Sequence, residues 1–169
     1  IHCAASIDQL NKETTYKNIL MFENVVRGFK GKILYFSSGA ALRGNPPTDP
    51  YGLSKWMVDK RIGTIPNAHS LRIWGCYGPD ELPTRFSAVC KRDGHVIIDQ
   101  DRYFDFIDVE DVKKIVQEYV FSKWPMPKCC NLVYRKKLLL SEWAKLFGAT
   151  FEIKDNHRLG DSYIFKGFQ

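Results

Sequence analysis

Apolar residues recur at helical spacing along residues 12–29, and a short apolar run, Lys32–Ser37, follows Gly31. The spacing predicts an amphipathic helix over 12–29. The run is short, contains aromatic residues and is bounded by glycine and serine, which is typical of a buried strand. Glycines and prolines over 39–50 then predict a loop.

The next elements repeat this alternation. After the loop we expect a helix that starts near Tyr51 and turns Trp56 and Met57 toward a core. A strand over 70–74 and a turn over Gly75–Pro79 follow. Further strands are predicted over 95–98, 103–107, 129–134 and 151–153, and further helices over 83–92, after Asp108, which can cap its helix, and after Ser141. Alternating strands and helices indicate an α/β fold with a mostly parallel sheet.

Composition narrows the function classes. The chain has 169 residues, a formal net charge of +6 and 44% hydrophobic residues, as expected for a globular domain. Its basic residues are scattered, so we expect no nucleic-acid partner. No apolar run reaches the length of a membrane span, so we expect no membrane partner.

Cysteine and histidine usage points to a reducing compartment without a metal site. The 5 cysteines are odd in number and include no C-x-x-C motif, which favours reduced thiols in a cytoplasmic protein. The 4 histidines do not combine with cysteines at zinc-binding spacing, so no metal is expected.

The stretch Tyr51-Gly-Leu-Ser-Lys55 carries candidate chemistry. Residues four apart share one face of a helix, so the Lys55 ammonium would lie near the Tyr51 phenol and favour the phenolate. Such a tyrosine can give and take a proton at a substrate oxygen. Ser38, at the end of the predicted strand, could bond the same oxygen. The alternative interpretation is a surface helix that carries both residues by chance.

Motifs on both sides extend this pattern. Five stretches follow one another along the chain: Ile1-His-Cys-Ala-Ala5, Tyr16-Lys-Asn18, Phe36-Ser-Ser-Gly39 with Tyr51 and Lys55, Leu71-Arg-Ile-Trp-Gly-Cys-Tyr-Gly-Pro79, and Arg102-Tyr-Phe-Asp-Phe-Ile-Asp-Val-Glu-Asp111. Together, in this order, they resemble the extended short-chain dehydrogenase/reductase family, and most closely its NAD-dependent epimerases and dehydratases of nucleotide sugars.

The resemblance implies a Rossmann-like sheet that binds NAD or NADP and an enzyme that transfers a hydride to or from a nucleotide-sugar substrate. It implies a catalytic set of Ser38, Tyr51 and Lys55. Cofactor contacts would come from Asn18, Tyr51, Lys55, Cys76 and Tyr77. Substrate contacts would come from Ser38, Gly39 and Arg102, with Ser38 and Gly39 as alternative registers for the catalytic serine position. A homodimer through the helices that carry Asn18 and Tyr51 would also fit the resemblance.

The match also has departures. The glycine-rich GxxGxxG loop that binds the cofactor pyrophosphate is absent from the sequence, so we expect a fold truncated on its N-terminal side, with further chain before Ile1. We expect residues 1–125 to form a partial Rossmann-like domain with a substrate-side insert at about 80–100, and residues 126–169 a small C-terminal substrate-side region.

A non-catalytic binding or assembly module of the same fold remains the alternative function. Purely structural roles also remain open for four residues. Asn18 could be an ordinary helix residue, Arg102 a surface cation, and Asp108 and Asp111 helix caps.

Overall fold

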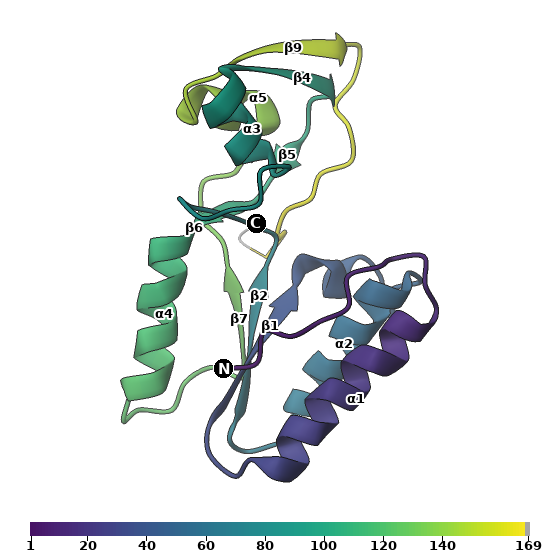
Figure 1. Ribbon diagram of the computed structural model, residues 1–169, viewed down its shortest axis with the longest axis vertical. Coiled ribbons are helices and arrows are strands. Elements are labelled where there is room, and N and C mark those ends of the chain that lie inside the picture. The colour runs from purple at the N-terminus through teal and green to yellow at the C-terminus, as the bar shows by residue number, and fades with distance from the viewer. Residues whose placement is uncertain (168–169) are drawn as a thin grey trace. The chain divides into compact units, whose positions relative to one another are not determined.

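The computed structural model describes residues 1–167, which fold into two compact units (Figure 1). Unit 1 comprises Ile1–Ile73 and Val112–Leu132, and the described part of unit 2 comprises Trp74–Asp111 and residues 133–167. Each unit therefore combines two separate stretches of chain, and each is described by itself. The domain bounds expected from the sequence, 1–125 and 126–169, remain a prediction.

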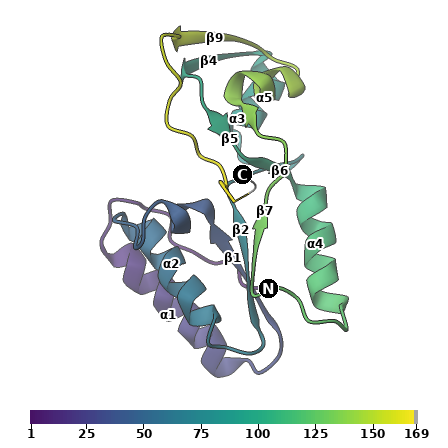
Figure 2. The same cartoon turned by 180° about the vertical axis from the view of Figure 1, so that it is seen from behind.

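Unit 1 is built on a parallel sheet in the order β1 (Ile33–Ser38), β2 (Ala68–Ile73), β7 (Cys129–Leu132). Helices α1 (Glu13–Gly28) and α2 (Pro50–Ile62) lie on one side of this sheet, and α4 (Val109–Phe121) lies on the other, as Figures 1 and 2 both show.

Alternation along the strands sends side chains to the two faces of this sheet. Toward α1 and α2, Tyr35 of β1 packs in a cluster with Phe22 and Val58. Toward α4, the ring of His69 in β2 meets Tyr119 edge-on, with centroids 5.3 Å apart. The sheet is therefore covered on both faces, as parallel sheets generally are.

Unit 2 contains short paired strands and two helices. The parallel pairs are β3 (Gly75–Tyr77) with β6 (Phe106–Asp108) and β4 (His95–Gln100) with β9 (Thr150–Asp155); β5 (Tyr103–Phe104) pairs antiparallel with β8 (Leu138–Leu139). Helices α3 (Phe86–Asp93) and α5 (Leu140–Leu146) complete the unit.

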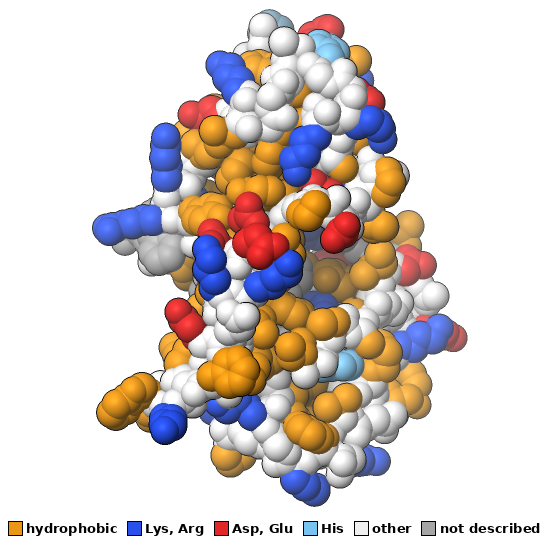
Figure 3. Space-filling model, turned by 60° about the vertical axis from the view of Figure 1, so that its left-hand side comes forward, with side chains coloured by type: hydrophobic (Ala, Val, Ile, Leu, Met, Phe, Trp, Pro, Cys, Tyr) orange, Lys and Arg blue, Asp and Glu red, His pale blue; other side chains and the backbone are white. Residues whose placement is uncertain are grey.

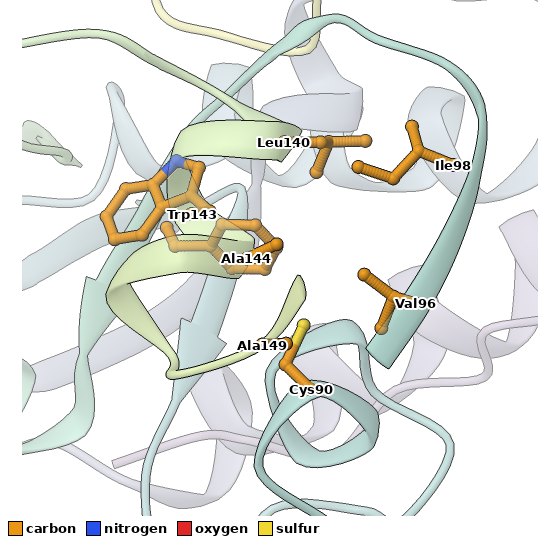
Figure 4. Close-up of a cluster of buried hydrophobic side chains, with 8 residues drawn as sticks. Cys90, Val96, Ile98, Leu140, Trp143, Ala144 and Ala149 are labelled. Carbon is orange, nitrogen blue, oxygen red and sulfur yellow. The ribbon is translucent and has the colours of Figure 1, made fainter. Parts of the chain in front are cut away.

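The centre of unit 2 is apolar and rich in aromatic rings (Figure 4). Its buried members are Cys90, Val96, Ile98, Phe106, Leu140, Trp143, Ala144 and Ala149. The Phe106 ring stacks on Phe104 at 4.4 Å and meets Trp143 edge-on at 5.3 Å. These offset and edge-on arrangements are the ones that aromatic pairs prefer.

The predicted α/β fold with a mostly parallel sheet is confirmed. Some local predictions are wrong. Gly75–Tyr77 is a strand and not a turn, because β6 supplies a pairing partner that is distant in sequence. Residues 103–107 divide into β5 and β6 around Asp105. The predicted loop over 39–50 begins with the short 3-10 helix η1 (Gly39–Leu42).

The orientation of α2 also differs from the prediction. Met57 is 40% exposed and Trp56 is half-buried, so neither forms the buried face. That face instead consists of Gly52, Ser54, Lys55, Val58, Asp59 and Ile62. Hydrophobicity alone could not identify it, because half of its members are polar or charged.

Two surface properties complete the description. No helix within residues 1–167 is both long enough and apolar enough to cross a membrane. On the face drawn in Figure 3, Lys and Arg side chains lie among acidic and apolar ones and form no continuous stripe.

Candidate active site

The start of α2 places Tyr51 beside the end of β1. Asp49 caps the helix by accepting a hydrogen bond from the Gly52 amide at 2.7 Å, and Pro50 occupies the first turn. A Cβ atom at Gly52 would lie 2.9 Å from the carbonyl oxygen of Ala40 in η1. Only glycine therefore allows α2 to approach η1 this closely.

Ser38 ends β1 and begins η1. Its hydroxyl oxygen accepts a hydrogen bond from the Ala40 amide at 3.2 Å, and the side chain is 7% exposed. The close approach of η1 and α2 thus brings Ser38 and Gly39 from one element, and Tyr51 from the other, to the same region of unit 1.

Lys55 is the most unusual residue of this region, because its side chain is charged and the residue is only 3% exposed. Its ammonium donates to the carbonyl oxygen of Phe36 at 2.8 Å. The same nitrogen lies 5.6 Å from the ring centroid of Tyr51 and 4.5 Å from that of Tyr35. The predicted neighbourhood of Tyr51 and Lys55 is therefore present.

Burial lowers the pKa of Lys55 to about 8, and the carboxylate of Asp59 partly opposes this shift. Asp59 is itself buried and accepts hydrogen bonds at 2.6 Å from both the Ser70 hydroxyl and the Arg72 guanidinium. Lys55 is thus mainly a cation at neutral pH, with a pKa well below its ordinary value, and it feels the charge of a carboxylate that other groups hold in place.

Asn18 supports the same helix from α1. Its side-chain oxygen accepts from the Ser6 amide at 2.7 Å, and its side-chain nitrogen donates to the Ser6 carbonyl at 3.0 Å and to the Ser54 hydroxyl at 2.8 Å. The Ser54 hydroxyl in turn donates to the carbonyl of Tyr51 at 2.7 Å. Both N–H groups of the Asn18 amide are used within the protein, and its contact with a cofactor remains a prediction.

The other predicted site residues belong to unit 2. Tyr77 packs its ring against Phe147 at 5.0 Å, and burial raises the pKa of both Tyr77 and the Cys76 thiol. The Nε atom of Arg102 is buried and has no hydrogen-bond partner within the described residues. Buried polar groups are normally paired, so this nitrogen suits a residue that binds an anionic group.

Two other acidic residues of unit 2 have local roles. Asp108 accepts from the Glu110 amide at 2.8 Å, as a residue at the start of α4 does, and Asp111 accepts from the Tyr134 hydroxyl at 2.7 Å. The interpretation of Asp108 as a helix cap is confirmed. Within residues 1–167, no three His, Cys, Asp or Glu side chains form a group that could hold a metal ion.

Sequence reasoning missed Tyr35 and Asp59. Asp59 continues the spacing of Tyr51 and Lys55 by one more turn, so it shares their face of α2, and this regularity was visible in the sequence. Tyr35 lies in an apolar run, and nothing in its sequence context indicated a role beside Lys55. Only the pairing of β1 and the reach of Lys55 bring its ring to the ammonium.

No family model and no curated protein matches the sequence. Solved structures do match. RMD from Pseudomonas aeruginosa, solved with NADPH, has a TM-score of 0.67 and 21% identity, over 89% of this chain and 63% of that one. UDP-glucose 4-epimerase from Thermus thermophilus, solved with NAD, has a TM-score of 0.69 and 17% identity, over 88% and 62%. WbmG from Bordetella bronchiseptica, solved with NAD and UDP, has a TM-score of 0.71 and 20% identity, over 94% and 57%.

These similarities confirm the predicted Rossmann-like fold, which this chain shares with proteins solved with NAD or NADPH. The chain spans only 57–63% of the length of these three proteins.

Proposed function

We propose that this chain carries the proton-transfer half of an NAD- or NADP-dependent enzyme that acts on nucleotide sugars as an epimerase, dehydratase or reductase. One observation carries the proposal. Tyr51 and the buried Lys55 share one face of α2, with the ammonium 5.6 Å from the tyrosine ring, next to the end of β1 where Ser38 lies.

Each residue has a defined task in this scheme. Tyr51 moves the proton at the sugar oxygen, and Ser38 orients that oxygen by a hydrogen bond. Lys55 favours the phenolate of Tyr51 by its charge. An ammonium has three donors, and the carbonyl of Phe36 accepts from one of them, so further N–H groups can bind the ribose hydroxyls of the cofactor. The nicotinamide, when bound, supplies or accepts the hydride.

Other features support the cofactor and substrate classes. Proteins of the same fold have been solved with NAD, NADPH and UDP. The unpaired guanidinium nitrogen of Arg102 suits a diphosphate, because guanidinium groups bind phosphate oxygens by charge-assisted hydrogen bonds. The same proposal includes cofactor contacts from Asn18, Cys76 and Tyr77. It also includes a homodimer and a cytoplasmic location.

The alternative function is a binding or assembly module of the same fold, which would carry out no turnover. The chain spans 57–63% of the length of the three similar proteins described above.

Cofactor binding separates the two functions. NADH and NADPH are titrated against the chain up to millimolar concentration, and binding is followed by nicotinamide fluorescence. We expect saturable binding of one of the two. If neither binds, this polypeptide is not itself an oxidoreductase, and the module becomes the better interpretation.

The role of Tyr51 is tested with the cofactor that binds and a panel of nucleotide sugars. Tyr51→Phe should lower kcat by about 100-fold or more while the cofactor affinity changes little, because general acid–base catalysis contributes factors of that size. Tyr16→Phe, on the exposed side of α1, is the matched control and should retain full turnover. Turnover that survives in Tyr51→Phe would contradict the assignment.

A further inference from the structure

Lys55 has a second aromatic neighbour that the proposed mechanism does not use. The ring of Tyr35 lies 4.5 Å from the ammonium, closer than the 5.6 Å of Tyr51. Tyr35 is 1% exposed, and its hydroxyl is buried without a hydrogen-bond partner within the described residues. Burial raises the pKa of Tyr35, so it remains a neutral phenol, and what it offers to Lys55 is the face of its ring.

Two further rings hold Tyr35 in place. His2 stacks on it at 5.5 Å with an interplanar angle of 23°, and Phe22 of α1 meets it edge-on at 5.3 Å. His2 is itself fixed beside β1, because its amide donates to the carbonyl of Leu34 at 2.7 Å and its carbonyl accepts from the amide of Phe36 at 3.2 Å. The plane of the Tyr35 ring is therefore set by neighbours from two other segments.

Phe36 links this arrangement to Lys55. Its amide binds His2 on one side, and its carbonyl accepts from the Lys55 ammonium at 2.8 Å. The backbone of β1 thus positions the ring stack and the ammonium at adjacent residues.

We propose that Tyr35 is a positioning residue for Lys55. Its ring, held by His2 and Phe22, stabilises the ammonium in the interior and keeps it beside Tyr51. A cation over an aromatic face is attracted by the ring quadrupole, and the attraction grows when the pair is removed from water. The importance of this contact for catalysis rests on the proposed function, whereas its effect on Lys55 does not.

Other groups that act on Lys55 must be kept constant in a test. Tyr51 and Asp59 reach it from α2, Tyr35 from β1, and His2 and Cys3 from the N-terminal segment. Burial, together with the charge of Lys55, lowers the pKa of His2. The imidazole is therefore neutral above pH 7 and adds no charge over the range in which Lys55 titrates.

The experiment follows the titration of the Lys55 amine by NMR on protein with isotope-labelled lysine, with the signal assigned by its loss in Lys55→Arg. Tyr35→Leu removes the ring and should lower the midpoint by about half to one pH unit, given the usual strength of such contacts. Tyr35→Phe keeps the ring, removes only the unpartnered hydroxyl, and should keep the midpoint. An unchanged midpoint in Tyr35→Leu, or an equal shift in Tyr35→Phe, would overturn the proposal.

A second variant covers the case in which Tyr35→Leu does not fold. Tyr35→pentafluorophenylalanine preserves the ring shape but withdraws electron density from its face, so the midpoint should fall relative to Tyr35→Phe. An equal midpoint in these two proteins would also overturn the proposal. No cofactor or substrate is needed, so the midpoint tests the role of Tyr35 alone, whereas cofactor binding and the turnover of Tyr51→Phe test the proposed function.

Discussion

The two units bury different kinds of side chain at their centres. In unit 1, the face of α2 that meets the sheet includes Ser54, Lys55 and Asp59. In unit 2, α5 contributes Trp143 and Ala144 to a centre of aromatic and aliphatic groups. Burial of polar groups costs free energy unless each is paired, whereas burial of aromatic rings stabilises directly.

Unit 2 also buries carboxylates, and these show the contrast more clearly. Asp105 bonds the Lys137 ammonium at 2.7 Å and the Phe165 amide at 2.7 Å, which ties separate segments of the unit together. The buried face of α2 instead contains a cation, Lys55, whose pKa burial lowers to about 8 against the opposing charge of Asp59. Perturbed groups of this kind gather at functional sites, so the comparison favours unit 1 as the location of the chemistry.

The largest loss of stability is expected from a mutation in the aromatic centre of unit 2. Phe106→Ala should lower the free energy of unfolding by about 4 kcal/mol, because the cavity it leaves is surrounded by rings that cannot collapse into it. Urea denaturation followed by tryptophan fluorescence measures the loss. Ile97→Ala, at an exposed position of β4, is the control and should cost about 0.5 kcal/mol or less. Similar losses in both would show that the aromatic packing is not the main support of this unit.

The buried ion pair of unit 1 comes next. Asp59→Asn should cost about 3 kcal/mol of stability, because the Arg72 guanidinium would lose its carboxylate in a site where water replaces it poorly. Asp93→Asn removes the exposed pair with Arg92 and should change stability by less than about 1 kcal/mol. Equal effects in chemical denaturation would contradict the view that α2 depends on its buried charges.

Replacement of Lys55 should raise the free energy of unfolding, whereas replacement of Asp59 should lower it. Its pKa falls from 10.5 unfolded to about 8 folded, so the buried ammonium opposes folding below pH 8 and this penalty disappears as the pH rises toward 10.5. Lys55→Met should therefore raise the free energy of unfolding at pH 7 by about 2 kcal/mol. The variant should also lack the gain in stability that the natural protein shows between pH 8 and 10.5.

Stability curves at several pH values test this prediction. Lys60→Met, on the exposed face of α2, is the control and should change neither the stability at pH 7 nor its pH dependence. A less stable Lys55→Met protein at pH 7 would mean that the contacts of the ammonium outweigh its burial.

The smallest change in stability is expected from the hydrogen bonds of Ser54, which connect α1 and α2. Ser54→Ala removes the acceptor for the Asn18 amide and the donor to the Tyr51 carbonyl. We expect a loss of about 1 kcal/mol, the usual net value of such hydrogen bonds. Thr48→Ala, at an exposed position just before the helix, provides the baseline in the same denaturation assay. A loss no larger than this baseline would show that water replaces both partners.

Local patterns predicted much of the fold. The run before Ser38 and the glycines and prolines after it were enough to predict β1, the connection and α2, because each depends on residues close in sequence. The strand Gly75–Tyr77 was not predictable in this way. It exists only because β6 lies beside it, and pairing between distant segments leaves little trace in a window of three residues.

The candidate site was predicted in part for the same reason. Tyr51 and Lys55 are joined by helical spacing, which a sequence displays directly. The contribution of Tyr35 depends on which face of β1 it occupies and on a bridge to His2, so it required the structure. The exposure of Met57 was mispredicted because the preference for apolar interiors fails on a helix whose buried face is polar.

The interleaved course of the chain has a consequence for its synthesis. A ribosome releases β1, α2 and β2 first, then the whole stretch Trp74–Asp111 of unit 2, and only afterwards α4 and β7. During that interval the edge of β2 that later pairs with β7 has no partner, and unpaired edges invite association with other chains. The region around Tyr51 and Lys55 can therefore assemble early, while the strand and helix that close its sheet arrive late, so the nascent chain would be most sensitive to aggregation before residue 132 has emerged.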